Sequence, residues 1–296
     1  MSESNLALWR SMLFVPGDNP SFLARAADRG ADALILDLED GVAPNNKMAA
    51  RSLTADAVES LFARGADVLV RINDPLRLAV ADLEAVVGAG LRAVVVPKAE
   101  SADYLARLAI LIRELEIERG LPAGGIGMIA QIESAQGLTA MDAIAATDGV
   151  IGLALGSEDL SADVGMAPLP HTLHGPAQQL VFAASRQGCM PFGFPDSIGI
   201  YTDTARLTEA VSRGREMGFR GAMAIHPAQV PIMNEHFLPT AGEIGFALRV
   251  KEALGDPANS DSGAIAVDGR MVDRPVALRA MQILEYARRF GALENG

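Results

Sequence analysis

The chain has 296 residues, of which half are hydrophobic and only 5% aromatic, and it carries a formal net charge of −12 at pH 7. That length suits one barrel-sized domain of roughly 250 residues with about 40 to 60 left for an appendage. The acidic balance argues against nucleic acid as a partner, because phosphate binding needs a basic face. The single cysteine, Cys189, excludes an intrachain disulfide, and its apolar surroundings predict a buried thiol.

The chain shows no targeting or membrane-spanning signal. The amino-terminal residues do not resemble a signal peptide, and no stretch approaches roughly 18 uninterrupted apolar residues. We therefore expect no membrane partner and a cytoplasmic location.

Short apolar runs recur along the chain, and nearly every one is followed or closed by charged or turn-forming residues. The runs cover residues 12–15, 33–38, 68–72, 93–97, 127–132, 150–156, 189–194 and 221–225. Unbroken apolar runs are typical of strands buried on both faces. Segments with helical periodicity lie between them, for example at 20–29, 47–64, 102–119 and 204–217, and several end on a C-capping glycine. This alternation predicts an α/β fold, a (β/α)8 TIM barrel, with its active site at the carboxyl ends of the strands.

The pattern changes after the eighth run. A short helix is expected at 229–236, then a helix at 241–254 with Thr240 as its N-cap. A polar loop at 255–263, extended segments at 264–267 and 269–271, and an amphipathic helix at 274–290 follow. The chain is thus predicted to comprise a barrel domain at 1–238 and a C-terminal helical extension at 239–296 that packs on the barrel or on a neighbouring subunit.

Glu133 and Asp159 follow two adjacent predicted strands, the fifth and the sixth. Two converging carboxylates, in a chain with one cysteine and four histidines, suit a hard cation such as Mg²⁺ better than zinc or iron. The alternative is that these carboxylates pair with helix N-termini or lysines.

Arg71 lies at the end of the third predicted strand and needs a partner, because an uncompensated interior charge is costly. Asp37 or Asp40 could supply a structural pairing. A substrate carboxylate held at two points is the interpretation we favour.

Lys98 follows the fourth strand and could indicate a Schiff-base aldolase, but an ion-pair role is preferred beside a candidate metal pair. The acidic residues Asp37, Glu39 and Asp40 could also form the metal site. Because side chains alternate in direction along a strand, not all three can point into one site. We expect one of them to order metal-bound water or Arg71, and another to cap the next helix.

Histidine 226 is the only histidine at a predicted strand end, where it could act as a general base or have a structural role beside Pro227. The other histidines, His171, His174 and His236, receive no function.

Together these residues resemble the citrate lyase β-subunit-like proteins of the HpcH/HpaI aldolase superfamily, which includes malyl-CoA and citramalyl-CoA lyases. The resemblance covers essentially the whole chain. Its motifs are RSMLFVPG at 10–17, LDLEDGV at 36–42, RIN at 71–73, VPK at 96–98, QIES at 131–134, GSEDL at 156–160, AIHPAQ at 224–229 and DGRMVD at 268–273.

The resemblance implies a barrel with a C-terminal extension through which subunits assemble, commonly as homotrimers or multiples of trimers. It implies that Glu133 and Asp159 bind Mg²⁺, with Mn²⁺ as a substitute, and that Arg71 binds the oxo-acid carboxylate. Glu158 and the backbone near Asp159 would meet substrate oxygens. Asp273 would complete the active site of a neighbouring subunit.

The implied reaction is reversible cleavage of a 3-hydroxyacyl-CoA, such as citramalyl-CoA, malyl-CoA or citryl-CoA, to a 2-oxo acid and an acyl-CoA. Two alternatives keep the fold. One is a metal-dependent aldolase of a free hydroxy-oxo acid or an acyl-carrier-protein thioester, and the other is a non-catalytic assembly subunit.

One departure from the family concerns CoA. Many relatives carry basic residues after the first strand, whereas here only Arg25, Lys47 and Arg51 are nearby cations, so electrostatic attraction for CoA should be weaker. The candidate CoA contacts are Phe14, Arg25, Lys47, His226 and Pro227. An apolar loop at 193–201 lies beside the predicted mouth.

Overall fold

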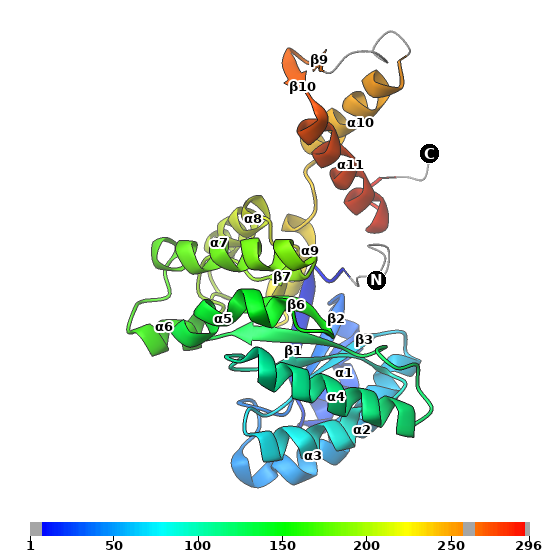
Figure 1. The fold of residues 1–296 in the computed structure, drawn as a ribbon, viewed down its shortest axis with the longest axis vertical. Helices are drawn as coiled ribbons and strands as arrows, with labels where there is room; N and C mark the ends of the chain where they lie inside the picture. The colour runs from blue at the N-terminus through cyan, green and yellow to red at the C-terminus, as the bar shows by residue number, and fades with distance from the viewer. Residues whose placement is uncertain (1–7, 257–263, 294–296) are drawn as a thin grey trace. The chain divides into compact units, whose positions relative to one another are not determined.

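The computed structural model describes residues 8–256 and 264–293 (Figure 1). The chain divides into two units, Met1–Phe237 and Leu238–Gly296, and each is described here by itself. Residues 257–263 of the expected polar loop lie outside the described residues. Among the described residues, no helix has the length and apolar character needed to cross a membrane.

Eight parallel strands make the sheet of the first unit, in the order β7-β6-β5-β4-β3-β2-β1-β8. They are β1 Ser11–Pro16, β2 Ala33–Asp37, β3 Asp67–Arg71, β4 Leu91–Val96, β5 Gly127–Ile132, β6 Val150–Leu155, β7 Met190–Phe192 and β8 Ala222–Ala224. The Gly193 N–H donates to the Gly221 carbonyl over 2.8 Å, and Phe192 bridges to Gly221 in parallel. The sheet therefore closes on itself, which confirms the predicted (β/α)8 barrel.

Helices connect successive strands and lie against the outside of the sheet (Figure 1). They are α1 Pro20–Arg25, η2 Ala26–Arg29, η3 Pro44–Asn46, α2 Lys47–Ala63, α3 Leu76–Val86, α4 Ala102–Glu118, α5 Ala135–Ala145, α6 Ser157–Val164, α7 Pro170–Gln187, α8 Thr204–Met217 and α9 Gln229–His236. The helix expected at 20–29 consists of α1 and a 3₁₀ turn, η2, that tightens the chain before Gly30 at φ 74°.

The strands present alternate residues to two cores, because successive side chains of a strand point to opposite faces. In β2, Leu34 and Leu36 pack toward the helices, while Ile35 joins a separate cluster inside the barrel. All eight strands contribute to that inner cluster, and Leu69 and Ile129 are its members from β3 and β5. A residue two places further along each strand must therefore lie at the mouth of the barrel.

The second unit has its own small core. It comprises α10 Ala241–Gly255, the antiparallel strands β9 Ile265–Val267 and β10 Arg270–Val272, and α11 Arg274–Arg289. Thr240 caps α10 in a reciprocal capping box with Glu243. The buried residues of this core are Ala247, Val250, Val267, Val272, Ala280 and Leu284.

Candidate active site

A cavity of about 390 Å³ lies at the carboxyl ends of the barrel strands. The alternation of side chains explains much of its lining: Phe14, Asp37, Arg71 and Gln131 each stand two residues beyond a member of the inner cluster. The full lining is Phe14, Pro16, Asp37, Asp40, Gly41, Arg71, Gln131, Glu133, Leu155, Gly156, Ser157, Glu158, Asp159, Ile198, Met223 and Ile225.

Arg71 is paired with carboxylates of its own chain. The parallel register of β2 and β3 sets Asp37 opposite Arg71, and the guanidinium donates from Nε and Nη2 to both Asp37 oxygens over 2.7 Å. Its Nη1 lies 3.2 Å from Glu39 Oε2. Burial lowers the pKa of Arg71, but its hydrogen bonds to the Asp37 carboxylate and the negative charges of Asp37 and Glu39 outweigh burial and raise that pKa. The structural pairing therefore exists, with Asp37 and Glu39 as partners and not Asp40.

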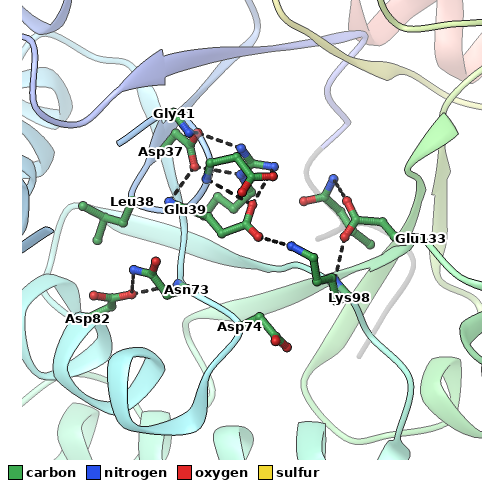
Figure 2. A network of polar contacts seen from close by, with 12 residues as sticks. Asp37, Leu38, Glu39, Gly41, Asn73, Asp74, Asp82, Lys98 and Glu133 are labelled. Atoms are coloured by element: carbon green, nitrogen blue, oxygen red, sulfur yellow. Dashed lines mark hydrogen bonds and ion pairs between the residues drawn. The ribbon is translucent and has the colours of Figure 1, made fainter. Parts of the chain in front are cut away.

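Lys98 joins the same network from β4. Its ammonium forms an ion pair with Glu39, and this bond raises the pKa of Lys98 against the lowering effect of burial (Figure 2). Lys98 has φ 46°, in the left-handed region that non-glycine residues seldom adopt. In this conformation its backbone N–H donates to Glu133 Oε2 over 2.7 Å, so a strained backbone position fixes the candidate metal ligand.

Glu133 is a buried carboxylate with few compensating charges. Its second oxygen, Oε1, accepts from Gln131 Nε2 at 3.1 Å. Burial, followed by the nearby charges of Asp159 and Glu39, raises the pKa of Glu133 to about 7, although the Lys98 N–H opposes the shift. A carboxylate pair in this setting would gain from a divalent cation.

The turn from β6 into α6 brings Asp159 to the same cavity. Asp159 lies in the first turn of α6, where the helix dipole favours negative charge. Gly156 precedes the helix, and a Cβ at Gly156 would lie 2.3 Å from Glu133 Cγ. Only glycine lets the two strand ends approach this closely.

The residues fit a hard cation. Gln131 Oε1 is buried at the cavity without a hydrogen-bond partner among the described residues. Within those residues the Asp159 carboxylate also accepts no hydrogen bond, although it faces the cavity. The described residues contain no group of three or more His, Cys, Asp or Glu side chains that could hold a metal, so a cation here would have two carboxylate ligands from the protein. This arrangement is typical of Mg²⁺, which takes waters and substrate oxygens as its other ligands.

The acidic cluster after β2 differs from the expectation in one respect. Asp37 does order Arg71 and also accepts from the backbone N–H groups of Glu39 and Gly41. None of the three carboxylates caps α2, whose N-cap is Asn46 without a side-chain bond. The expectation of a helix cap was wrong, because the 3₁₀ turn η3 separates the cluster from the helix. Asp40 is exposed and lines the cavity.

Of the other predicted substrate and CoA contacts, Glu158 and Phe14 line the cavity and Arg25 does not. Glu158 lines the cavity and accepts from Ser197 Oγ at 2.5 Å, and Phe14 lies beneath the Arg71 guanidinium at 4.6 Å. Arg25 is exposed and donates to the Ser21 carbonyl.

Lys47 is less free than expected for a CoA contact. Its ammonium donates to the carbonyls of Leu38 and Glu39 at 2.7 and 2.5 Å, and burial lowers its pKa. His226 is exposed and stacks on Tyr201 at 4.7 Å, with the half-buried Pro227 beside it.

Two more predicted residues have structural partners. Asp273 lies in the second unit, where its side chain caps α11 by accepting from the Val276 N–H at 3.3 Å. Cys189 is buried, as predicted, and burial raises the pKa of its thiol.

From the sequence, Gln131 and Gly156 received no role, although both shape this site, whereas Glu39 was one of three carboxylates expected to bind a metal, order Arg71 or cap the next helix. The signal for Gln131 was present, because it shares the strand parity of residues already placed at the mouth. The role of Gly156 depends on a contact between two strand ends and has no local signal.

Residues 10–227 match the family HpcH/HpaI aldolase/citrate lyase, and the chain belongs to this family. It is 34% identical over 293 residues to citrate lyase subunit beta of Leuconostoc mesenteroides subsp. cremoris, covering 96% of this chain and 95% of that protein. It is 32% identical over 288 residues to (3S)-malyl-CoA thioesterase of Cereibacter sphaeroides, covering 96% of each.

The same fold occurs in a solved structure of CitE from Mycobacterium tuberculosis, in complex with magnesium, acetoacetate and coenzyme A. The TM-score is 0.76 at 32% identity, over 95% of this chain and 99% of that chain. The family and the fold predicted from the sequence motifs are thus confirmed.

Proposed function

We propose that the protein is a Mg²⁺-dependent carbon–carbon lyase that cleaves or forms a 3-hydroxyacyl-CoA. The observation that carries this proposal is the convergence of Glu133 and Asp159 on one cavity, beside Arg71 and a Gln131 oxygen that has no hydrogen-bond partner in the described part of the chain. The CitE structure with magnesium, acetoacetate and coenzyme A supports the same ligand classes for this chain.

Glu133 and Asp159 would hold the cation, with Mn²⁺ as a substitute. When bound, Mg²⁺ supplies Lewis acidity and a template for the substrate carboxylate and hydroxyl. Asp37 accepts two of the five guanidinium N–H groups of Arg71, and Glu39 forms an ion pair with Nη1, so N–H groups remain for a substrate carboxylate. Arg71 would thereby orient the oxo acid and offset its charge.

In the cleavage direction a base takes the hydroxyl proton, the carbonyl of the 2-oxo acid forms, and the carbon–carbon bond breaks. Its electron pair passes to the thioester enolate, which is protonated to the acyl-CoA. We propose Asp273 of a neighbouring subunit as the group that moves this proton, in a homotrimer or a multiple of trimers. Asp37 and Lys98 support the site by fixing Arg71 and Glu133.

Thioester hydrolysis is a second candidate function. It is favoured by the 32% identity to relatives named (3S)-malyl-CoA thioesterase. The further alternatives are an acyl-carrier-protein thioester or a free hydroxy-oxo acid as the substrate, and a non-catalytic assembly subunit. The last of these is favoured by the relatives named citrate lyase subunit beta.

The test is product analysis with purified protein, Mg²⁺ and malyl-CoA, citramalyl-CoA or citryl-CoA. A lyase releases acetyl-CoA and a 2-oxo acid, whereas a thioesterase releases free CoA and a hydroxy acid. Release of CoA alone would support the second candidate, and no reaction with any thioester would contradict both.

A further inference from the structure

The lining of the cavity contains two chemical kinds of residue: the acidic residues with Arg71, and the apolar residues Leu155, Ile198, Met223 and Ile225, which we call the apolar side. Ile198 and Ile225 are neighbours, because the Gln229 side chain bonds to the backbone of both. We infer that the apolar side receives the group attached to the keto carbon of the 2-oxo acid, and that it selects hydrogen or a short alkyl group over one that bears a second carboxylate. This inference rests on the proposed function and narrows its substrate class.

The charges of the lining support this choice. Five carboxylates line the cavity, those of Asp37, Asp40, Glu133, Glu158 and Asp159. Arg71 is the one cationic residue of that lining in the part of the chain that the structure describes, and it is already paired with Asp37 and Glu39. A bound Mg²⁺ and Arg71 can compensate one substrate carboxylate, but a second one would enter an acidic cavity to which the described residues of the same subunit add no further cation.

The apolar side consists of Ile198, Ile225, Met223 and Leu155. Met223 and Leu155 are buried, whereas the Ile225 side chain is 45% exposed. Ile225 directly follows β8, and Ile198 lies in the loop between β7 and α8. A carboxylate against this surface would lose hydration without gaining a hydrogen bond, which is the condition that excludes charged groups.

Gln229 links the two isoleucines. Its side chain is fully buried, and its Nε2 donates to the carbonyls of Ile198 and Ile200, both at 2.8 Å. Its Oε1 accepts from the N–H groups of Ile225 and His226 at 2.8 and 3.0 Å. One amide thus joins the backbones of both loops, and Gln229 is a positioning residue for the apolar side.

Two further contacts hold these loops. The Tyr201 and His226 rings stack with their centroids 4.7 Å apart, and the Ile198 N–H donates to Ser157 Oγ, at the start of α6, at 3.1 Å. The apolar side is therefore a built surface with fixed spacing, and a longer substituent cannot simply displace it.

The first experiment compares kcat/KM for citramalyl-CoA, malyl-CoA and citryl-CoA, whose cleavage gives a methyl, hydrogen or carboxymethyl group on the keto carbon. We expect citryl-CoA to be the poorest substrate by at least about 10-fold, because its second carboxylate is desolvated without a partner. A smaller difference, or a preference for citryl-CoA, would overturn the inference while leaving the lyase proposal intact.

If no thioester is cleaved, the proposed function fails but the inference can still be tested by calorimetry with saturating Mg²⁺. Pyruvate should then bind more tightly than oxaloacetate. Equal or tighter binding of oxaloacetate would contradict the selection.

The second experiment supplies the missing cation. Ile225→Lys should shift the kcat/KM ratio of citryl-CoA to citramalyl-CoA toward citryl-CoA by about 10-fold or more. Ile110→Lys is the matched control, because Ile110 is 57% exposed on α4 and does not line the cavity. An equal shift in both variants, or none in either, would count against the apolar side as the selecting element.

The third experiment tests Gln229. Gln229→Glu keeps an acceptor for the Ile225 N–H but replaces the donor to the Ile198 carbonyl with a carboxylate oxygen. The kcat/KM for citramalyl-CoA divided by that for citryl-CoA should therefore become smaller. Gln178→Glu is its control, since Gln178 also donates to a backbone carbonyl, that of Met217, away from the cavity. A loss of kcat with an unchanged ratio would show a merely structural role.

Discussion

At the scale of the residue, Arg71 is bound to carboxylates of its own chain and also faces the cavity. The structural pairing and the substrate role weighed from the sequence are therefore compatible. The fork of N–H groups allows both, because an ammonium could not span Asp37, Glu39 and a substrate at once.

Arg71→Lys should lower kcat/KM by an amount that corresponds to a loss of about 2 to 4 kcal/mol of transition-state stabilisation. The reason is that lysine cannot reproduce the two-point contact with the substrate carboxylate. Arg113→Lys is the control, because Arg113 pairs with Asp148 at the surface. Steady-state kinetics measure both. Near-normal kcat/KM for Arg71→Lys would leave the pairing with Asp37 as its whole role.

Glu133→Gln and Asp159→Asn should each weaken Mg²⁺ binding and abolish turnover with the fold retained, because each removes one of two anionic ligands. Metal titration by calorimetry and a circular dichroism spectrum test this. Asp103→Asn, which removes another carboxylate from a first helical turn, should change neither. Unchanged metal affinity in both site variants would remove them from the metal site.

The raised pKa of Glu133 also predicts a pH dependence of stability in metal-free protein. The folded state holds this proton up to about pH 7, above the ordinary value of 4.5, so the stability that the proton gives is lost as the pH rises through this window. In the presence of a chelator, Glu133→Gln should therefore gain stability relative to the wild type between pH 5 and pH 8, on the order of 1 to 3 kcal/mol. Urea unfolding of both proteins at pH 5 and at pH 8 measures the free energy of unfolding. If the difference in that free energy between variant and wild type is the same at both pH values, the pKa of Glu133 is not raised.

At the scale of the element, the turn from β6 to α6 determines how closely Glu133 and Asp159 approach. Gly156→Ala is compatible with its backbone, φ −90°, but its methyl group would meet Glu133. We expect weaker Mg²⁺ binding and a lower melting temperature, because the buried Glu133 side chain must move to make room for the methyl group. Gly175→Ala in α7, where a Cβ would meet nothing within 4 Å, is the control. Equal metal affinity in the two variants would show that Glu133 adapts freely.

At the scale of the whole molecule, Asp273 belongs to a unit with its own core. Asp273→Asn keeps an N-cap for α11, because asparagine caps as well as aspartate. The variant should therefore remain folded and lose turnover.

Mixing inactive Asp273→Asn with inactive Glu133→Gln, under conditions that exchange subunits, should restore partial activity, since some sites then receive both intact residues. Native mass spectrometry verifies the mixed oligomers. If they form and no activity returns, the cross-subunit role of Asp273 is wrong.

The sequence by itself determined the barrel, because each strand carries its own apolar run, the segments between them have helical periodicity, and several of these end on a capping glycine. It also located the strand ends at which Arg71, Glu133 and Asp159 stand, since parallel strands bring their carboxyl ends together. These inferences need only the local pattern of apolar residues and the rule that the carboxyl ends of parallel strands share one edge of a sheet.

Tertiary structure alone decided which of these residues touch. Arg71 took Asp37 because the β2–β3 register sets them opposite each other, and Glu39 joined them by sharing the parity of Asp37. Lys98 and Glu133 were joined through a left-handed backbone position, and Gln229 connected two loops from opposite ends of its amide. Such contacts depend on distances between segments far apart in the chain, for which no single stretch of sequence carries a signal.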